Sequence, residues 1–361
     1  MSVENQHSQK VLKRFNLYAK ALDGSSDTDK KIMVFVKAKK SLDISRYAQN
    51  FPNLQISPLF DRYFFSARLF FQLTRYCIEH SRSSILLIAG DPWVDSCIVT
   101  ILKKLLWWIP IKTQMSVHGD LINQEKSRFK RWVKKIAFVI LLNNSDTIRV
   151  VSEHLGKAIV DELRVESSKV FVSPIPTTLP KLIDSIGGSK KYIAFVGRLH
   201  PERGLSEYLS IIKCLKGVSV DFKYLIAGDG PDRTSFLGEI ARIVGIENVS
   251  YRGWLSDEEM ANVWKDCKIL LSTAPAEGYG LAVRESILNG TFVIARENSG
   301  TQEARKEFKY GLHIYQNVDQ AVALVSNLMQ ETFSISSLEQ ARNLVNKSNE
   351  ESINNLINSW R

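Results

Sequence analysis

The chain has 361 residues, of which 44% are hydrophobic and 10% aromatic, so it is long enough for two domain cores and too apolar to be intrinsically disordered. Its four cysteines form no C-x-x-C pair and have no metal-like spacing, which argues against a zinc or disulfide framework and predicts buried thiols in a reducing compartment. The polar first ten residues lack a secretory signal, and no apolar run approaches the ~20 residues that cross a bilayer, so we expect a cytoplasmic protein.

The net charge of +10 is unevenly distributed. Residues 1–188 contain 28 Lys and Arg against 17 Asp and Glu, whereas the remainder contains 20 against 21. A basic first half indicates an anionic partner, which from charge alone is an acidic membrane surface, an anionic acceptor or nucleic acid. The alternative is a basic surface that only keeps the protein soluble.

In chain order, residues 1–30 are polar and predict a flexible N-terminal lead-in. Strands are then expected at 31–36, 84–89, 113–117, 147–152 and 169–173, and helices at 64–80, 95–108 and 153–163. Alternating strands and helices predict a parallel sheet covered on both faces, whose ligands bind at the carboxyl ends of strands. His118 and Gly119 follow the strand at 113–117; His118 faces a ligand there or is structural.

Another helix is expected over residues 125–142, beginning at Glu125 and ending at Leu142. Lysines and arginines alternate in it with Phe129 and Trp132, a pattern typical of an interfacial helix attracted to anionic lipid. A packed domain helix with a solvated basic face is the alternative. After it, Pro174, Pro176 and Pro180 interrupt regular structure and residues 186–189 have linker composition, so we expect domains at 31–188 and 189–361.

The second half restarts the alternation, with strands expected at 192–197, 223–228, 249–253, 268–273 and 291–295 and helices over 317–361. Ser256 and Glu259 predict a capping box at a helix start. This pattern predicts a doubly wound nucleotide-binding domain. The loop after Gly197 lacks G-x-G-x-x-G and no Walker lysine pattern exists, so dehydrogenase and P-loop chemistry are unsupported.

The most informative stretch runs from Glu277 to Glu285. Gly278 and Gly280 form a tight loop after a buried strand, and a helix is expected from Leu281 to about residue 288. Glycines let a backbone approach a ligand, and the first N–H groups of a helix attract an anion. Glu277 and Glu285 would flank that site. Arg198 and Arg203, five residues apart in another strand-to-helix turn, have the spacing to clamp a diphosphate.

Five motifs in this half follow one another over about 110 residues: V-G-R-L at 196–199 with Arg203-Gly204, A-G-D-G-P at 227–231, Y-R-G-W-L-S at 251–256, E-G-Y-G at 277–280 with Glu285, and S-G at 299–300 with Glu303. This series resembles glycosyltransferase family 4, the retaining, nucleotide-sugar-dependent group 1 glycosyl transferases. The resemblance implies a GT-B fold, an α/β architecture of two Rossmann-like doubly wound domains facing each other across a cleft. His118-Gly119 also resembles the family's H-G.

The resemblance implies a role for each matching residue. Glu277 would hold donor-sugar hydroxyls, Glu285 the ribose hydroxyls, and Arg198 and Arg203 would neutralise the leaving diphosphate, while His118 would face the sugar. Backbone contacts to sugar, phosphate and base would come from Gly197, Gly253, Trp254, Gly278, Tyr279, Gly280 and Leu281. The chain departs from the family in its first loop, where residues 37–40 are K-A-K-K in place of paired glycines, and at 174–178, where P-I-P-T-T replaces P-N-G-V-D.

We therefore expect a retaining, metal-independent hexosyltransferase with no cofactor, using a UDP- or GDP-sugar. The acceptor is expected to be a glycan or lipid-linked molecule of surface polysaccharide or lipopolysaccharide biosynthesis, with the protein placed peripherally on the cytoplasmic face of the membrane. The alternatives are a GT-B phosphorylase or sugar-phosphate synthase and a non-catalytic nucleotide-sugar-binding protein. Nucleic acid is not an expected partner, because the basic residues accompany no reader motif.

Overall fold

The computed structural model describes residues 14–22, 32–37, 54–59, 65–119, 127–177, 190–217 and 223–360. The chain divides into two compact units: unit 1 contains residues 1–176 and 350–361, and unit 2 contains residues 177–349. The boundary expected from the sequence, after Gly188, lies outside the described residues. Residues 173 and 174 belong to unit 1 because Arg149 of that unit donates hydrogen bonds to the carbonyl oxygens of Ser173 (3.1 Å) and Pro174 (3.2 Å).

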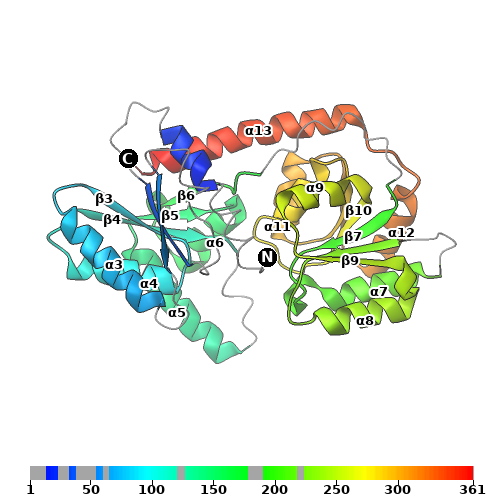
Figure 1. The fold of residues 1–361 in the computed structure, drawn as a ribbon, viewed down its shortest axis with the longest axis horizontal. Coiled ribbons are helices and arrows are strands. Elements are labelled where there is room, and N and C mark those ends of the chain that lie inside the picture. The colour runs from blue at the N-terminus through cyan, green and yellow to red at the C-terminus, as the bar shows by residue number, and fades with distance from the viewer. Residues whose placement is uncertain are drawn as a thin grey trace. The chain divides into compact units, whose positions relative to one another are not determined.

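Unit 1 contains a four-stranded parallel sheet whose strands lie in chain order, together with a separate parallel pair (Figure 1). The sheet consists of β3 (Ile85–Ala89), β4 (Ile111–Val117), β5 (Thr147–Val150) and β6 (Val170–Val172), and the pair of β1 (Ile32–Lys37) and β2 (Leu54–Leu59). The helices are α3 (Phe65–Glu79), α4 (Val94–Leu105), α5 (Arg128–Asn144), α6 (Glu153–Leu163) and the 3-10 turn η1 (Ser167–Lys169). Helix α4 packs on β3 and β4, and α6 packs on β5 and β6. The predicted parallel sheet is confirmed for β3 to β6, whereas the expected first strand, β1, pairs instead with β2, an additional strand.

The first residues of unit 1 include a packed helix over residues 14–22. Its Tyr18 and Ala19 are buried, and the ring of Tyr18 meets that of Trp360 edge to face at 5.9 Å. The guanidinium of Arg149 lies 6.0 Å from the Tyr18 ring centroid. The expectation of a flexible lead-in over residues 1–30 therefore does not hold for residues 14–22, because their apolar face is covered by the end of the chain.

Unit 2 contains a six-stranded parallel sheet in the order β12-β11-β10-β7-β8-β9. Its strands are β7 (Tyr192–Val196), β8 (Lys223–Ala227), β9 (Val249–Gly253), β10 (Cys267–Ser272), β11 (Phe292–Arg296) and β12 (Leu312–Tyr315). The chain starts in the middle at β7, proceeds outward to β9 and returns to β10 on the other side of β7. Such a reversal of strand order is where doubly wound sheets bind ligands. The arrangement confirms the doubly wound domain that the sequence predicted.

The helices of unit 2 agree with the capping signals in the sequence. They are η2 (Pro201–Arg203), α7 (Leu205–Leu215), α8 (Arg233–Val244), η3 (Ile246–Asn248), α9 (Asp257–Asp266), α10 (Leu281–Ile287), α11 (Ser299–Glu307), α12 (Val318–Leu328) and α13 (Ile335–Asn358). At the start of α9 the Ser256 N–H donates to Glu259 Oε2 (2.7 Å) and the Glu259 N–H to Ser256 Oγ (3.3 Å). The predicted capping box is thus confirmed.

Helix α13 ends in unit 1, so the chain passes between the units twice. In unit 2, the Thr177 N–H donates to Asn349 Oδ1 (2.9 Å) and Asn349 Nδ2 donates to the Thr177 carbonyl (2.8 Å). In unit 1, the hydroxyl of Ser352 donates to the Pro174 carbonyl (2.8 Å). These bonds join residues 174–177, where the chain leaves unit 1, to residues 349–352, where it returns.

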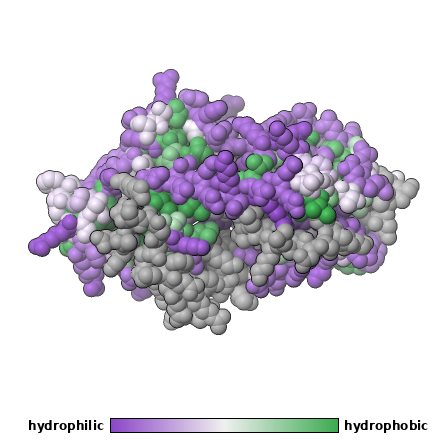
Figure 2. Space-filling view, turned by 90° about the horizontal axis from the view of Figure 1, so that it is seen from above, coloured by the Kyte–Doolittle hydropathy of each residue, from purple (hydrophilic) through white to green (hydrophobic). Residues whose placement is uncertain are grey.

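The cysteines are unpaired, but only Cys77 and Cys267 are buried. Cys97 and Cys214 are exposed, which corrects the prediction of buried thiols, because both lie on solvent-facing sides of their helices. In the part of the chain that the structure describes, no helix is long and apolar enough to span a membrane. Figure 2 shows a mainly hydrophilic face with small hydrophobic groups.

Candidate functional site

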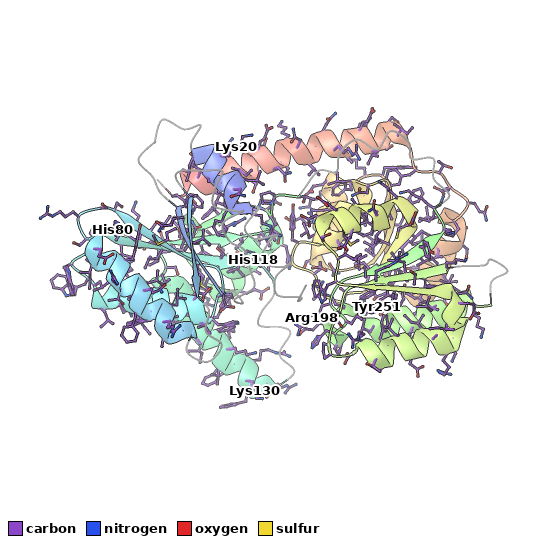
Figure 3. All side chains as sticks on the ribbon, viewed as in Figure 1. Lys20, His80, His118, Lys130, Arg198 and Tyr251 are labelled. Atoms are coloured by element: carbon purple, nitrogen blue, oxygen red, sulfur yellow. The ribbon has the colours of Figure 1, made fainter. Side chains whose placement is uncertain are left out.

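The carboxyl end of the unit 2 sheet brings the sequence-predicted residues to one edge. Gly197 and Arg198 directly follow β7, and the loop of Glu277 to Gly280 connects β10 to α10. Because β7 pairs with β10, these two loops are neighbours at the point where strand order reverses. Figure 3 shows Arg198 at this end of the strands. The sequence therefore located the edge of the sheet where a ligand is expected.

Arg203 and Glu277 form an ion pair at this edge. Arg203 Nη1 lies 2.6 Å from Glu277 Oε2, and the two side chains are 40% and 19% exposed. The sequence predicts diphosphate binding for Arg203 and sugar binding for Glu277, but no contact between the two. The pair keeps both charges compensated in the protein alone, and it places a cation and a carboxylate at the same point of the crevice.

Arg198 differs from Arg203 in its surroundings. Its side chain is exposed, whereas the neighbouring Leu199 is completely buried and anchors the loop in the core. The Leu199 N–H donates to the Asp229 carbonyl (3.0 Å), which ties the loop after β7 to the loop after β8. A fixed backbone therefore presents a solvent-accessible guanidinium in the same strand-to-helix turn as Arg203.

The glycine loop is held by a residue that sequence analysis did not select, Arg284 on α10. Its side chain is 1% exposed and forms two hydrogen bonds with the Glu307 carboxylate, at 2.9 and 3.2 Å. It also donates to the Tyr279 carbonyl oxygen, and its guanidinium lies 3.8 Å from the centroid of the Tyr279 ring. Burial raises the pKa of the Tyr279 hydroxyl, an effect that the positive charge of Arg284 opposes. Arg284 thus connects the loop, through the Tyr279 carbonyl, to Glu307 of α11.

Several glycines at this edge permit contact between loops rather than approach of a ligand. A Cβ on Gly204 would lie 1.9 Å from the Thr273 carbonyl oxygen, and one on Gly228 equally close to that of Gly197. A Cβ on Gly300 would lie 2.4 Å from the Glu277 carbonyl oxygen. Gly197 itself has φ of 150° and nothing within 4 Å of an added Cβ, so it leaves open space for a ligand. The strand-end loops therefore form one interlocked backbone.

The remaining predicted donor contacts lie along the same edge. Gly253 ends β9 with φ of 62°, and its carbonyl accepts a 2.7 Å hydrogen bond from the Gly228 N–H. Trp254 follows and is 37% exposed. Three inter-strand steps separate β9 from β10, roughly 14 Å at ~4.8 Å each. An elongated ligand lying across the strand ends would contact both Trp254 and Glu277.

Helix α10 begins at Leu281, with Gly280 as N-cap at φ of 72°. This start agrees with the prediction, and the helix has seven residues. Gly278, Leu281 and Glu285 are half-buried, whereas Tyr279 is 7% exposed. The loop therefore offers backbone at Gly278 and Leu281, while the Tyr279 side chain serves its packing against Arg284.

His118 lies in unit 1, directly after β4 (Figure 3). His118 is exposed at the surface, yet desolvation by the surrounding protein, followed by the charges of Arg149 and Arg14, lowers its pKa to about 4. The imidazole is therefore neutral at physiological pH. The lysine-rich residues 38–40 lie outside the described part of the chain. Within that part, no group of three or more His, Cys, Asp or Glu side chains is arranged to hold a metal ion.

Unit 1 also contains a cavity of about 270 Å³ between α5 and α6, bordered by Val117 and Gly119 at the end of β4. Arg128, Arg131 and Lys135 of α5 line it together with apolar side chains of both helices. The sequence predicts the basic helix but not the cavity beneath it.

Residues 183–351 match the family model of glycosyl transferases group 1, so this part of the chain is similar to that family. An uncharacterized glycosyltransferase of Bacillus subtilis, YqgM, is 21% identical over 236 residues, covering 64% of this chain and 63% of the relative. The 2-deoxystreptamine glucosyltransferase of Streptomyces kanamyceticus is 26% identical over 198 residues, covering 54% and 50%. The chain thus spans between half and two thirds of the length of these curated relatives.

Among solved structures, Anabaena Alr3699/HepE in complex with UDP-glucose superimposes with a TM-score of 0.71 at 15% identity. The alignment covers 97% of this chain and 95% of that structure. At this identity the likeness concerns the fold, and it establishes that the chain has the GT-B architecture of two Rossmann-like domains. The fold class predicted from the sequence is confirmed.

Proposed function

We propose that this protein is a retaining hexosyltransferase that moves a sugar from a UDP- or GDP-sugar to a glycan or lipid-linked acceptor in surface polysaccharide or lipopolysaccharide assembly. The observation that carries the proposal is the Arg203–Glu277 pair beside the glycine loop, at the strand-order reversal of a domain matching the group 1 family. Glycosyltransferase relatives over about half of the chain support it.

In this proposal the donor lies along the carboxyl edge of the unit 2 sheet. Trp254 and Gly253 contact the base, Glu285 the ribose hydroxyls and Glu277 the sugar hydroxyls. Arg198 and Arg203 bind the diphosphate, with Arg203 exchanging part of its contact with Glu277 for phosphate oxygens. An arginine's planar fork can do this, because it has several N–H donors available at once.

The reaction breaks the bond between the anomeric carbon and a diphosphate oxygen. Negative charge grows on that oxygen, and the two arginines stabilise it more strongly in the transition state than in the bound donor. The acceptor hydroxyl bonds to the anomeric carbon on the same face, and its proton passes to the departing phosphate oxygen. Configuration is retained, and the scheme needs neither a side-chain base nor a metal ion.

His118 is proposed to contact the transferred sugar as a neutral hydrogen-bonding group. Its pKa of about 4 means that the imidazole keeps one donor and one acceptor nitrogen throughout the physiological range. A charged imidazolium would repel the positive charge that develops on the sugar ring, so the lowered pKa suits this role.

Membrane contact forms part of the proposal because α5 carries exposed apolar side chains among its lysines and arginines. Phe129 and Trp132 are 72% and 60% exposed, and Ile140 is 55% exposed. Trp107 and Trp108 after α4 are also exposed, and α4 packs against α5. Exposed aromatic residues beside basic charges favour the interface of an anionic membrane, so we place the protein peripherally on the cytoplasmic face.

The proposal is tested by measuring binding and turnover of UDP- and GDP-sugars by the purified protein. We expect one nucleotide-sugar to raise the unfolding midpoint and to be consumed when acceptor-containing membranes are added, with the product retaining anomeric configuration. Consumption only with inorganic phosphate or a sugar phosphate as acceptor would indicate a phosphorylase or synthase instead. Binding without turnover under every condition would indicate a non-catalytic protein.

A further inference from the structure

The cavity of unit 1 combines an apolar floor with a basic rim. Arg128, Arg131 and Lys135 stand at positions i, i+3 and i+7 of α5, so they share one side of the helix, and all three line the cavity. Phe138 of the same helix and Ile159 of α6 are buried and form part of the floor. Arg128 and Lys135 are exposed and Arg131 is half-buried. Three cations on one side of a helix attract an anion more strongly than one cation alone.

Helix α6 contributes to the same environment. Its first turn contains His154, which lines the cavity, and Ser152 caps the helix by accepting a hydrogen bond from the Leu155 N–H (3.3 Å). The lining residues of α6 run from this first turn to Leu163 at its end, so the N-terminal N–H groups are one part of the cavity wall, and Glu153 lies in the same turn. Glu162, two turns further along, is the one carboxylate among the lining residues, so the positive charges predominate.

The other side of α5 is apolar and exposed. Phe129, Val133, Ile136 and Ile140 stand at i, i+4, i+7 and i+11 and are 43% to 72% exposed. Trp132 lies between the two sides: it lines the cavity and is 60% exposed. A ligand bound in the cavity therefore passes Trp132 where it leaves for the apolar side of the helix.

The size of the cavity limits what it holds. About 270 Å³ lies just below the roughly 300–1,000 Å³ of sites for small molecules. Such a volume accommodates one charged group and its immediate attachment. Arginine pairs suit the tetrahedral arrangement of phosphate oxygens, to which they bind in a bidentate manner.

We propose that this cavity binds the phosphate group of the acceptor, beside the loop that carries His118. The inference rests on the proposed function, because it assigns the acceptor of that reaction to the class of phosphorylated molecules. The phosphate belongs either to a lipid carrier or to a water-soluble phosphorylated glycan, and both present the same group to Arg128, Arg131 and Lys135.

The test measures binding of inorganic phosphate and of glycerol phosphate to the full chain by calorimetry, with UDP present at saturation so that the donor arginines are occupied. The double variant Arg128→Gln/Lys135→Gln is expected to weaken both ligands about tenfold, since it removes two charge-assisted contacts. Its matched control, Lys130→Gln/Lys134→Gln, removes the same charge from side chains of α5 that do not line the cavity and is expected to bind like wild type.

Ala158→Leu fills the cavity without changing charge, and we expect it to weaken phosphate as well. Equal losses in the two double variants, no effect of Ala158→Leu, or no phosphate binding to the wild type would overturn the proposal. Unfolding midpoints of all variants identify any that fail to fold, and Ala158→Leu and the charge variants provide independent readouts in that case.

Vesicles distinguish the two sources of phosphate. The wild type is sedimented with phosphatidylcholine vesicles containing phosphatidate, whose phosphate is terminal, or phosphatidylglycerol, whose phosphate is internal, at equal charge. A preference for phosphatidate that only the cavity variants lose supports a lipid-borne phosphate; equal sedimentation with intact glycerol phosphate binding supports a soluble acceptor. UDP binding is recorded on the same samples. Its absence would contradict the proposed function, and phosphate titration of Arg198→Ala would still test the cavity.

Discussion

The two units differ in how the side chains of their candidate sites are held. In unit 2, the loops at the carboxyl ends of the strands contact one another through glycine backbones, and the buried Arg284 fixes the loop of Glu277. In unit 1, α5 leaves Trp132 and Ile140 exposed beside a cavity with a basic rim. One unit has its functional groups on an interlocked backbone, whereas the other has them on the surface of a helix.

Under the proposed function, this difference corresponds to different requirements of binding. A nucleotide diphosphate has a fixed chemical shape, so its site gains from loops that are ordered before the ligand arrives. Acceptors and membranes are larger and more variable, and a helix face with separate apolar and basic sides contacts them without a fixed frame. The comparison predicts that substitutions in unit 2 affect stability and turnover strongly, and that those on α5 affect binding with little loss of stability.

The largest effect on stability is expected for Arg284→Ala. Removing the guanidinium leaves the Glu307 carboxylate and the Tyr279 carbonyl without their partner, and breaking a buried pair costs about 3 kcal/mol or more. Urea unfolding measures the change. Arg242→Ala, which removes an exposed pair with Glu239, is the control and should leave the midpoint unchanged. If Arg284→Ala has the same unfolding free energy as wild type, the contacts of Arg284 with Tyr279 and Glu307 do not stabilise the loop.

Turnover is expected to fall about 100- to 1,000-fold in Glu277→Gln and Arg198→Ala, the range seen when one stabilising group is removed from an active site. Both side chains retain solvent contact, so the unfolding midpoint should change little. Donor consumption is measured at saturating nucleotide-sugar. Glu258→Gln, an exposed carboxylate at the start of α9, is the control. Turnover near that of the control in both variants contradicts the assigned roles.

A smaller effect is expected from pH through His118. Because its pKa is lowered from 6.5 to about 4, the unfolded chain binds a proton in this window that the folded chain does not. The unfolding free energy should therefore decrease as pH falls from 6.5 towards 4, and His118→Gln should reduce that slope. NMR titration of the imidazole checks the pKa directly. A midpoint near 6.5 would refute both the pKa assignment and the neutral role.

The smallest change in stability is expected for Trp132→Ser/Ile136→Ser on α5. Both side chains are already exposed, so the unfolding free energy should remain within about 0.5 kcal/mol per substitution. Sedimentation with anionic vesicles at low salt should nevertheless decrease. Ile246→Ser, at an exposed isoleucine of unit 2, serves as the matched control and should not alter it. Unchanged vesicle binding of the double variant argues against membrane contact through α5.

Much of unit 2 was predictable because its strands are buried on both faces. Residues 193–195 and 269–271 are almost completely buried, and such continuous apolar runs identify strands of a parallel sheet without an alignment. The loop from Glu277 to Gly280 was predictable for a related reason: glycines between a strand and a helix have few alternative explanations.

Other features depend on contacts that a linear pattern does not reveal. Strand β2 contains Gln55, Ser57 and Pro58, which interrupt the apolar pattern, so pairing with β1 is its main identifying property. Arg284 resembles any surface arginine in the sequence, and its contacts with Tyr279 and Glu307 are seen only in the structure. The cavity beneath α5 likewise depends on packing against α6, and β5 separates these two helices in the sequence.

The double passage of the chain has a consequence for synthesis on the ribosome. Buried Gln114, on β4, donates to the Ser359 hydroxyl (3.1 Å) and accepts from Trp360 Nε1 (3.3 Å). These partners are translated after all of unit 2, which thus forms an insertion within unit 1. A nascent chain can complete the sheet of unit 2 first, while the central strand of unit 1 still lacks its last hydrogen-bonding partners. Unit 1 is then the final part to become protease-resistant, although its synthesis begins first.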